Sequence, residues 1–526
     1  MVLTEILARN ARMYGGKVAL IEREPEKKGR REITWRQFYH QANAFSNALI
    51  GMGVKKGDRV VHLMMNCLEW LPAYFGILRA GAIAVPLNFR FEASAISGCT
   101  NLCDARVLVF GPEFTERIRE VKAELDTSVL HYMFAGPAAA CPEFARPCDA
   151  VTADADLAEP DVHIDPGDGA AIYFTSGTTG APKGVYLLHR QLESACYVEN
   201  RHHNQVHEDN FLCIPPLYHT GAKMHWFGNF IVGARAVILK GVGPKAILEA
   251  VSEERITIVW LLVPWAHDIL VALENEEVRL SEYSIDQWRL MHIGAQPVPP
   301  SLIEKWQRFF PGQSYDTNYG LTEATGPGCV HLGMENMDKI GAIGVPGFDW
   351  ECRVADESGS DAPAGRPGEL LVKGPGVMQY YYKNPDATRS TLENGWLRTG
   401  DIVRKDEDGF LWLVDRKKDV IITGGENIFP VEIESFLMTH RDILDAGVIG
   451  VPDERLGEVV AAVVSPKPGR RITADQIREF CSAMPRYKRP RRIFFDDVPR
   501  NPTGKIEKPK LRKKYAGFPA DAAAGS

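Results

Sequence analysis

The segment from Tyr173 to Gly184, YFTSGTTGAPKG, has the composition of a loop that binds phosphate groups. Its glycines let the backbone turn tightly with amide groups exposed, its Ser and Thr residues add hydroxyl donors, and Lys183 supplies a compact positive charge. The runs Ala170–Thr175 and Val185–Leu188 on either side predict strands. The segment is not a Walker A loop, because the chain contains no GxxxxGK[ST] string. We predict that it wraps polyphosphate oxygens, and the alternative is a plain Ser/Thr/Gly hairpin turn.

Four later segments also combine turn residues with polar or charged side chains. They are YGLTEAT from Tyr319, GWLRTGD from Gly395, DRKKD from Asp415 followed by GGEN from Gly424, and PRNPTGK from Pro499. Together with the loop, this ordered series resembles the motifs of the adenylate-forming superfamily, which contains acyl-CoA synthetases, firefly luciferase and the adenylation domains of peptide synthetases. The resemblance extends over about residues 10 to 515.

The resemblance implies an ATP site built from these motifs. Tyr319 would stack on the adenine ring, and the segment Gly294–Gln296 would form the floor of the base and acyl sites. Asp401 would accept both ribose hydroxyl groups, because an ionised carboxylate is a strong acceptor, and Arg416 would lie near the ribose and phosphates. The implied ATP- and AMP-binding residues are Thr175, Ser176, Gly177, Thr178, Thr179, Gly180, Lys183, Gly294, Ala295, Gln296, Asn318, Tyr319, Gly320, Asp401 and Arg416.

The resemblance also implies a reaction in two steps. ATP would first activate a carboxylic acid to acyl-AMP with release of pyrophosphate, and the thiol of coenzyme A would then take the acyl group and release AMP. Lys505 would bridge the attacking carboxylate and the α-phosphate, and Thr322 would hydrogen-bond the α-phosphate. Glu323 would hold Mg²⁺, whose hard charge suits carboxylate and phosphate oxygens. No protein nucleophile is needed, because the substrate carboxylate is already ionised at neutral pH.

Two half-reactions in one site require a change of arrangement. By resemblance, the small C-terminal domain would rotate about Lys418, the hinge residue, between the two steps. We expect an N-terminal adenylation domain over residues 1–417 and a C-terminal domain over residues 418–526 that carries Lys505. An ordinary exposed lysine in a charged turn is the alternative for Lys418.

The acyl and CoA sites are implied less directly. His219, Lys223, Trp226, Phe227 and Phe230 have a spacing that places them on one face of a helix. The matching segment of relatives lines the acyl tunnel, so the acyl pocket is assigned to His219, Lys223, Trp226, Phe227 and Gly294, which favours a medium-chain, cyclic or aromatic acid. Packing of the same aromatic rings in the core is the alternative. An ammonium is costly to bury, so Lys223 should reach solvent, pair with a protein carboxylate or meet an anionic group of the substrate. The implied CoA-binding residues are Gly424, Gly425, Arg486 and Lys488.

Other functions remain open beside acid–CoA ligation. A stand-alone enzyme that loads an acyl group onto a carrier protein is the main alternative, followed by a luciferase-like oxygenase and a non-enzymatic nucleotide sensor. Amino-acid adenylation is disfavoured, because the segment in which those domains place an amine-binding Asp reads PLYHTG from Pro216. A metal site at His202, His203 and His207 is also disfavoured, because polar neighbours indicate a loop.

The elements that must position these motifs alternate between strand and helix patterns, which predicts an α/β fold. Thr257–Val263 is a continuous apolar run typical of a buried strand, and Ser301 with Glu304 has the form of a capping box at a helix start. Turn residues punctuate Gly341–Asp415 and predict a β-rich subdomain. We expect a large N-terminal domain of layered α/β sheets with this subdomain, followed by a small, mobile α+β C-terminal domain.

In the C-terminal domain, Pro430 is expected in the first turn of a helix that runs to about His440. Thr473 and Gln476 are expected to cap another helix. Strands are predicted at Leu444–Val451, Glu458–Val464 and Arg492–Phe495.

The composition of the chain argues against some classes of binding partner and cellular location. The formal net charge of −7 argues against general nucleic-acid binding, which needs clustered Lys and Arg. The ten cysteines include no CxxC pair, which fits reduced thiols in a cytosol. The most apolar stretch is far shorter than the ~20 residues needed to span a bilayer. We expect a cytoplasmic protein whose partners are a small carboxylic acid, ATP and CoA, and we leave a homodimer open.

Overall fold

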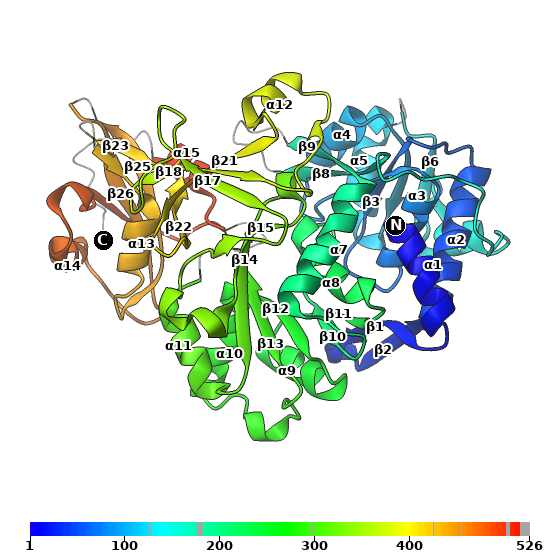
Figure 1. The fold of residues 1–526 in the computed structure, drawn as a ribbon, viewed down its shortest axis with the longest axis horizontal. Coiled ribbons are helices and arrows are strands. Elements are labelled where there is room, and N and C mark those ends of the chain that lie inside the picture. Colours follow the sequence, from blue (N-terminus) through cyan, green and yellow to red (C-terminus); the bar gives the residue numbers. More distant parts are fainter. Residues whose placement is uncertain are drawn as a thin grey trace.

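A computed structural model describes residues 1–125, 128–175, 182–295, 298–423, 426–453, 455–500 and 505–515 of the chain. Figure 1 shows two large layered regions, a smaller group of strands above them and a compact unit at the C-terminal end. Among the described residues, no helix is both long enough and apolar enough to span a bilayer.

The first large sheet has the strand order β16-β15-β14-β13-β12-β10-β11-β1-β2 within the described residues. Its central pairs are parallel, and β2, β15 and β16 attach in antiparallel fashion. The bounds are β1 Val18–Glu24, β2 Gly29–Thr34, β10 Asn210–Cys213, β11 Arg235–Leu239, β12 Ile258–Leu262, β13 Leu290–Gly294, β14 Ser314–Gly320, β15 Pro327–His331 and β16 Val345–Pro346. Every residue of β12 is buried, which confirms the prediction of a buried strand there and is typical of parallel sheets covered on both faces.

The second large sheet has the order β19-β9-β8-β4-β3-β5-β6-β7 within the described residues. Its bounds are β3 Arg59–Leu63, β4 Ile83–Pro86, β5 Ala105–Phe110, β6 His131–Phe134, β7 Arg146–Pro147, β8 Gly169–Thr175, β9 Lys183–Leu188 and β19 Tyr380–Tyr381. Strands β8 and β9 form an antiparallel pair in which Thr175 lies opposite Lys183. The two strands predicted on either side of the glycine-rich segment are therefore confirmed, and they form an antiparallel pair.

Helices cover both sheets, and α7 and α8 lie between them (Figure 1). Helix α7 contacts β8 and β9 of the second sheet and β15 of the first, while α8 contacts β10 and β11. The helices of this part are α1 Leu3–Tyr14, α2 Trp35–Gly51, α3 Trp70–Arg79, α4 Ala93–Leu102, α5 Thr115–Leu125, α6 Cys148–Thr152, α7 His189–His203, α8 Thr220–Ile231, α9 Pro244–Glu253, α10 Val263–Glu274 and α11 Pro300–Phe309.

The start of α11 differs from the expected capping box. The helix begins at Pro300 with Pro299 as its N-cap, so Ser301 lies inside the first turn and does not cap it. Proline suits this position because its ring fixes φ near the helical value and its missing N–H is one that no helical carbonyl would accept.

The segment from Glu351 to Arg416 confirms the β-rich subdomain. Its strands pair in antiparallel fashion, and the short helix α12 Pro385–Thr391 directly precedes β20 in the chain. The strands are β17 Glu351–Ala355, β18 Pro367–Lys373, β20 Leu392–Glu393, β21 Trp396–Lys405 and β22 Leu411–Arg416. In the pair β21–β22, Asp401 lies opposite Arg416. Two of the predicted motifs therefore meet across one ladder.

The C-terminal unit has its own sheet and its own apolar core. Its elements are β23 Ile421–Thr423, β24 Glu426–Ile428, α13 Pro430–Leu437, β25 Ile443–Asp453, β26 Gly457–Pro466, α14 Ala474–Phe480, β27 Arg492–Phe495 and α15 Lys508–Tyr515. Thr473 and Gln476 form the expected capping box, and Pro430 occupies the first turn of α13. That helix ends at Leu437, three residues before the expected end.

Candidate active site

Strands β8 and β9 place Thr175 opposite Lys183, on either side of the glycine-rich segment. Residues 176–181 lie outside the described part of the chain, so the predicted phosphate contacts of Ser176, Gly177, Thr178, Thr179 and Gly180 stay predictions. The Lys183 ammonium lies 4.9 Å from the centre of the Tyr381 ring. The hydroxyl group of Tyr381 donates a hydrogen bond of 2.8 Å to Oε1 of Glu323. Tyr381 therefore contacts both Lys183 and Glu323, the proposed magnesium ligand.

Tyr381 is a site residue that the sequence motifs did not reveal. It reaches the site because β19 pairs with β9, with Tyr381 opposite Val185. The only signal in the sequence is the run of three tyrosines at Tyr380–Tyr382. A run of this kind also suits ordinary packing on a sheet edge, so it did not single out one ring.

Glu323 fits a hard divalent cation such as Mg²⁺. It begins the first turn of a short 3₁₀ helix, Thr322–Ala324, and its side chain is only half-buried. One carboxylate oxygen is engaged by Tyr381, and carboxylate oxygens are ligands that Mg²⁺ prefers. Thr322 lies beside it, and its hydroxyl oxygen is 3.4 Å from that of Thr220 at the start of α8.

Tyr319, Asp401 and Arg416 form one connected group. The Tyr319 hydroxyl donates to Oδ2 of Asp401, and Nε of Arg416 lies 2.6 Å from Oδ1 of the same carboxylate. Asp401 is only 2% exposed. Burial, followed by the charge of Asp401, holds the pKa of Tyr319 well above its ordinary value, so the phenol stays a donor at neutral pH. The buried carboxylate is therefore paired and oriented before any ribose reaches it.

Lys505 from the C-terminal unit belongs to the same group. It keeps solvent-accessible surface, yet the surrounding protein atoms lower its pKa to about 8. Desolvation is the larger cause and the positive charge of Arg416 the next, while Asp401 and Glu323 oppose the shift. Lys505 also lowers the pKa of His219 at the start of α8, after the larger effect of burial. A cation from the end of the chain thus acts electrostatically on groups from three earlier motifs.

The ends of strands β13 and β14 carry further residues assigned to the nucleotide site. Gly294 ends β13, and Ala295 follows it in a left-handed conformation with φ of 68°. Gly320 ends β14, where a Cβ atom would lie 2.7 Å from the carbonyl oxygen of Gly326, so a larger residue would force the backbone apart. Asn318 precedes Tyr319 on the same strand. Gln296 lies outside the described residues.

Family models match this arrangement in two parts. The model described as AMP-binding enzyme matches residues 7–382, and the model described as AMP-binding enzyme C-terminal domain matches residues 432–505. The chain belongs to the AMP-binding enzyme family. This membership confirms the resemblance seen in the motifs.

Relatives of the family are similar over nearly their whole length. The chain is 34% identical to feruloyl-CoA synthase of Amycolatopsis sp, with 92% of this chain and 94% of that protein covered. It is 31% identical to the long-chain-fatty-acid–CoA ligase FadD13 of Mycobacterium tuberculosis, with 92% and 93% covered. Its fold is similar to the crystal structure of the anthranilate CoA ligase AuaEII in complex with anthranoyl-AMP, with a TM-score of 0.87, 26% identity and 98% and 97% of the two chains covered.

These findings confirm the expected class of enzyme. The chain is an AMP-forming acid–CoA ligase of the AMP-binding family, and ATP, Mg²⁺ and coenzyme A take part in its reaction. A small-molecule acid, ATP and CoA are its partners. The relatives do not favour the carrier-protein alternative.

The segment assigned to the acyl pocket forms the helix that the spacing predicted, α8, with His219 as its N-cap. Trp226 and Phe227 have no exposed surface and belong to a buried aromatic group with Phe75 and Phe230. This packing favours the core interpretation of these two rings over the pocket interpretation. Their contact with substrate stays a prediction.

Lys223 neither reaches solvent nor pairs with a protein carboxylate, the first two expected options, and a contact with the substrate stays a prediction. It is fully buried, and its ammonium donates to the backbone carbonyl oxygens of Leu217 and His219. The rings of Trp70, Tyr74 and Tyr173 surround it at 4.7 to 5.4 Å. Desolvation lowers its pKa well below the ordinary value. Carbonyl dipoles and aromatic faces thus take the place of the expected solvent or carboxylate partner.

Two of the residues assigned to CoA, Arg486 and Lys488, lie in one short 3₁₀ turn of the C-terminal unit. Lys488 is paired with Glu432 at 2.6 Å, whereas Arg486, in the same short 3₁₀ turn, is exposed. Gly424 and Gly425 lie outside the described residues. No contact among the described residues tests their role, so these four assignments stay predictions.

Tyr381→Phe should weaken the Glu323 site of this family member. The change removes the hydroxyl donor to the carboxylate and keeps the ring beside Lys183. Because hydrogen bonds to charged groups contribute about 1.5–3 kcal/mol, we expect the KM for MgATP to rise roughly tenfold or more. Steady-state kinetics with varied MgATP checks this, with Tyr382→Phe as the matched control. An unchanged KM in both variants would show that the hydrogen bond does not support the metal ligand.

Proposed function

We propose that this ligase activates a medium-chain, cyclic or aromatic carboxylic acid with ATP to form acyl-AMP and pyrophosphate, and then transfers the acyl group to the thiol of CoA with release of AMP. The observation that carries the proposal is the buried group of Tyr319, Asp401 and Arg416, which brings separate motifs together and whose charges act on Lys505 of the C-terminal unit. Several relatives have names that specify aromatic acids, including feruloyl-CoA synthase and the indoleacetate–CoA ligase of Aromatoleum aromaticum, 31% identical over 98% of this chain. These names support the choice of acid.

In the first step, an oxygen of the acid attacks the α-phosphorus while the bond to the β-phosphate oxygen breaks. The Lys505 ammonium stabilises the negative charge shared by the attacking carboxylate and the α-phosphate. Thr322 donates its hydroxyl proton to the same phosphate, and Lys183 holds the phosphates that leave. Glu323 would hold Mg²⁺, which neutralises phosphate charge when bound. Asp401 and Tyr319 hold the nucleoside.

In the second step, the thiol of CoA loses its proton to solvent, its sulfur forms a bond to the acyl carbon, and the bond from that carbon to the phosphate oxygen breaks, which releases AMP. Lys505 must leave the site to give the thiol access, so the unit after residue 417 rotates about Lys418. Strand β22 ends at Arg416 in one sheet, and β23 begins at Ile421 in the next, so only four residues connect the two sheets. This short connection, in which Lys418 is exposed, supports the pivot and the division at residues 417 and 418. Of the two described CoA candidates, Arg486 is more accessible than Lys488.

The pH dependence of kcat/KM for adenylation should reveal the loss of the proton of Lys505. Its pKa of about 8 means that the ammonium loses its proton at a lower pH than an ordinary lysine does. Because the charged form stabilises the transition state, kcat/KM for adenylation should fall above about pH 8, by about tenfold per pH unit. Carboxylate-dependent pyrophosphate release from pH 6 to 10 measures this limb. A profile that stays flat to pH 10 would contradict the assignment of a titrating lysine.

A screen of acids tests the substrate. Pyrophosphate release would be measured with acetate, fatty, cyclic, aryl and dicarboxylic acids, each with and without CoA. We expect the highest kcat/KM with a cyclic, aryl or medium-chain acid, and a thioester product only when CoA is present. Highest activity with acetate, or acyl transfer to a phosphopantetheinyl carrier in preference to CoA, would overturn the proposal.

We also propose a cytoplasmic location, which the ten free cysteines support. We also propose that the protein forms a homodimer. Light scattering of the purified protein tests this, because a dimer has twice the mass of one chain.

A further inference from the structure

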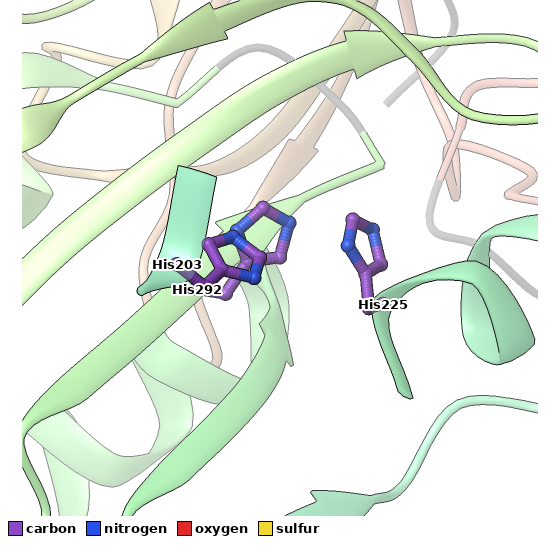
Figure 2. A group of neighbouring side chains, drawn as sticks. All are labelled: His203, His225 and His292. Atoms are coloured by element: carbon purple, nitrogen blue, oxygen red, sulfur yellow. The ribbon is translucent and has the colours of Figure 1, made fainter. Parts of the chain in front are cut away.

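A buried cluster of imidazole and carboxylate groups lies between the helices α7 and α8 and the strands β13 and β14. It contains Glu199 and His203 from α7, His225 from α8, His292 from β13 and Asp316 from β14. Each of these residues is at most 6% exposed. Figure 2 shows the three imidazole rings close together, with His225 approaching from the side opposite His203 and His292. Sequence spacing paired His203 with His207, but the fold pairs it with residues from other elements.

Each ring has a nitrogen beside a carboxylate, and Nδ1 of His203 also lies 3.5 Å from Oε2 of Glu199. Nδ1 of His292 hydrogen-bonds Oδ1 of Asp316, Nε2 of His203 lies 2.8 Å from Oδ2 of Asp316, and Nδ1 of His225 lies 3.1 Å from Oε2 of Glu199. A neutral imidazole that donates from one nitrogen presents an acceptor lone pair on the other. Nε2 of His292 has no hydrogen-bond partner within the described residues. The cluster therefore combines oriented rings with a lone pair that is available on Nε2 of His292.

The charges of the cluster also require a partner. Two carboxylates in a buried volume are unfavourable unless positive charge compensates them. Protonation of one ring could compensate one carboxylate, but protonation of two is unfavourable, because the centre of the His292 ring lies 4.1 Å from that of His225 and 4.9 Å from that of His203. Two imidazolium ions at such separations would repel each other. A divalent cation among neutral rings compensates both carboxylates without that repulsion.

We propose that His203, His225 and His292 bind a divalent transition-metal ion, zinc being the best match, and that Asp316 and Glu199 orient the rings. Histidine ligands of zinc usually donate their second N–H to a carboxylate or carbonyl group, which is the arrangement of these rings. One nitrogen from each of the three rings lies within 4.8 Å of the others. Zinc–nitrogen bonds of about 2.0–2.1 Å need separations of about 3.4 Å in a tetrahedron, so small side-chain rotations must bring the rings closer. A water molecule completes the coordination.

The ion would connect two strands that carry site residues. His292 lies two residues before Gly294 on β13, and Asp316 lies three residues before Tyr319 on β14. Binding would fix these strands against α7 and α8, so it should raise the thermal stability of the chain. This site uses nitrogen ligands and differs from the oxygen site at Glu323, where Mg²⁺ is expected.

Metal binding to the full-length, tag-free chain tests the proposal. The protein is treated with a chelator, dialysed and titrated with Co²⁺, and its metal content after exposure to Zn²⁺ is measured by plasma mass spectrometry. We expect one ion per chain, a visible absorption band of tetrahedral cobalt that zinc abolishes, and a higher melting temperature with zinc. No ATP or acid is present, so the result does not depend on the proposed reaction. A chain that retains no metal and shows no cobalt band overturns the proposal.

Substitutions locate the ion. His225→Gln and His292→Gln should each abolish stoichiometric zinc, and Asp316→Asn should lower zinc affinity about 10–100-fold. His267→Gln is the matched control, because its ring is exposed on α10. Equal metal content in all of these variants would mean an adventitious ion only and would overturn the site. Circular dichroism checks that each variant folds, and if the ligand variants do not fold, the cobalt spectrum of the unaltered chain decides.

Discussion

Lys505→Ala should slow the formation of acyl-AMP by about 100-fold or more, because loss of one preorganised charge-stabilising donor commonly costs this much in rate. Lys505 is the cation that the C-terminal unit adds to the group around Asp401 and Arg416, and desolvation and the charge of Arg416 lower its pKa to about 8. Alanine removes the charge and leaves the buried pairing of Asp401 with Tyr319 and Arg416 in place. Single-turnover measurements of carboxylate-dependent pyrophosphate release check the result.

The second half-reaction separates this role from a loss of structure. Acyl-AMP supplied to the Lys505→Ala enzyme should still react with CoA at a rate near that of the unaltered enzyme, because thioester formation does not use this ammonium. Lys510→Ala is the control, since Lys510 is an exposed lysine on the following helix. Near-normal pyrophosphate release by Lys505→Ala would remove Lys505 from the catalytic group.

Lys418→Pro should block CoA-dependent turnover while it leaves pyrophosphate exchange largely intact. Proline fixes φ near −65° and restricts the residue before it, so it prevents the backbone rotation that a pivot requires. In the present arrangement, the hydrogen bonds of this turn are donated by the amides of Lys417, Asp419 and Val420. Proline at 418 keeps all three donors, so the adenylating arrangement should survive. We expect a loss of at least about 100-fold in thioester formation.

Lys418→Ala is the matched control for backbone rotation. It removes the same exposed side chain but leaves φ free, so both half-reactions should persist. Isotope exchange between pyrophosphate and ATP measures the first half-reaction, and thioester release from supplied acyl-AMP measures the second. Equal losses of both half-reactions in Lys418→Pro would indicate misfolding or a pivot at another residue.

The sequence by itself determined the family, the order of the elements and the ends of many of them. Contiguous motifs carried this information, because a strand of apolar residues or a proline at a helix start depends on local chemistry. Thr473 with Gln476 and Pro430 behaved as local rules predict. Ser301 did not, because Pro300 started the helix one residue earlier. Local rules therefore fail where two start signals compete.

The tertiary structure alone decided which side chains meet. Tyr381 reaches Glu323 because β19 pairs with β9, a contact between segments about 200 residues apart that no motif encodes. Lys223 is buried among three rings and two carbonyl groups, although its charge predicted solvent or a carboxylate partner. The three histidines converge from two helices and a strand, whereas spacing along the chain suggested a different set. The reason is physical: long-range packing fixes side-chain partners, and a sequence pattern reports only neighbours within a few residues.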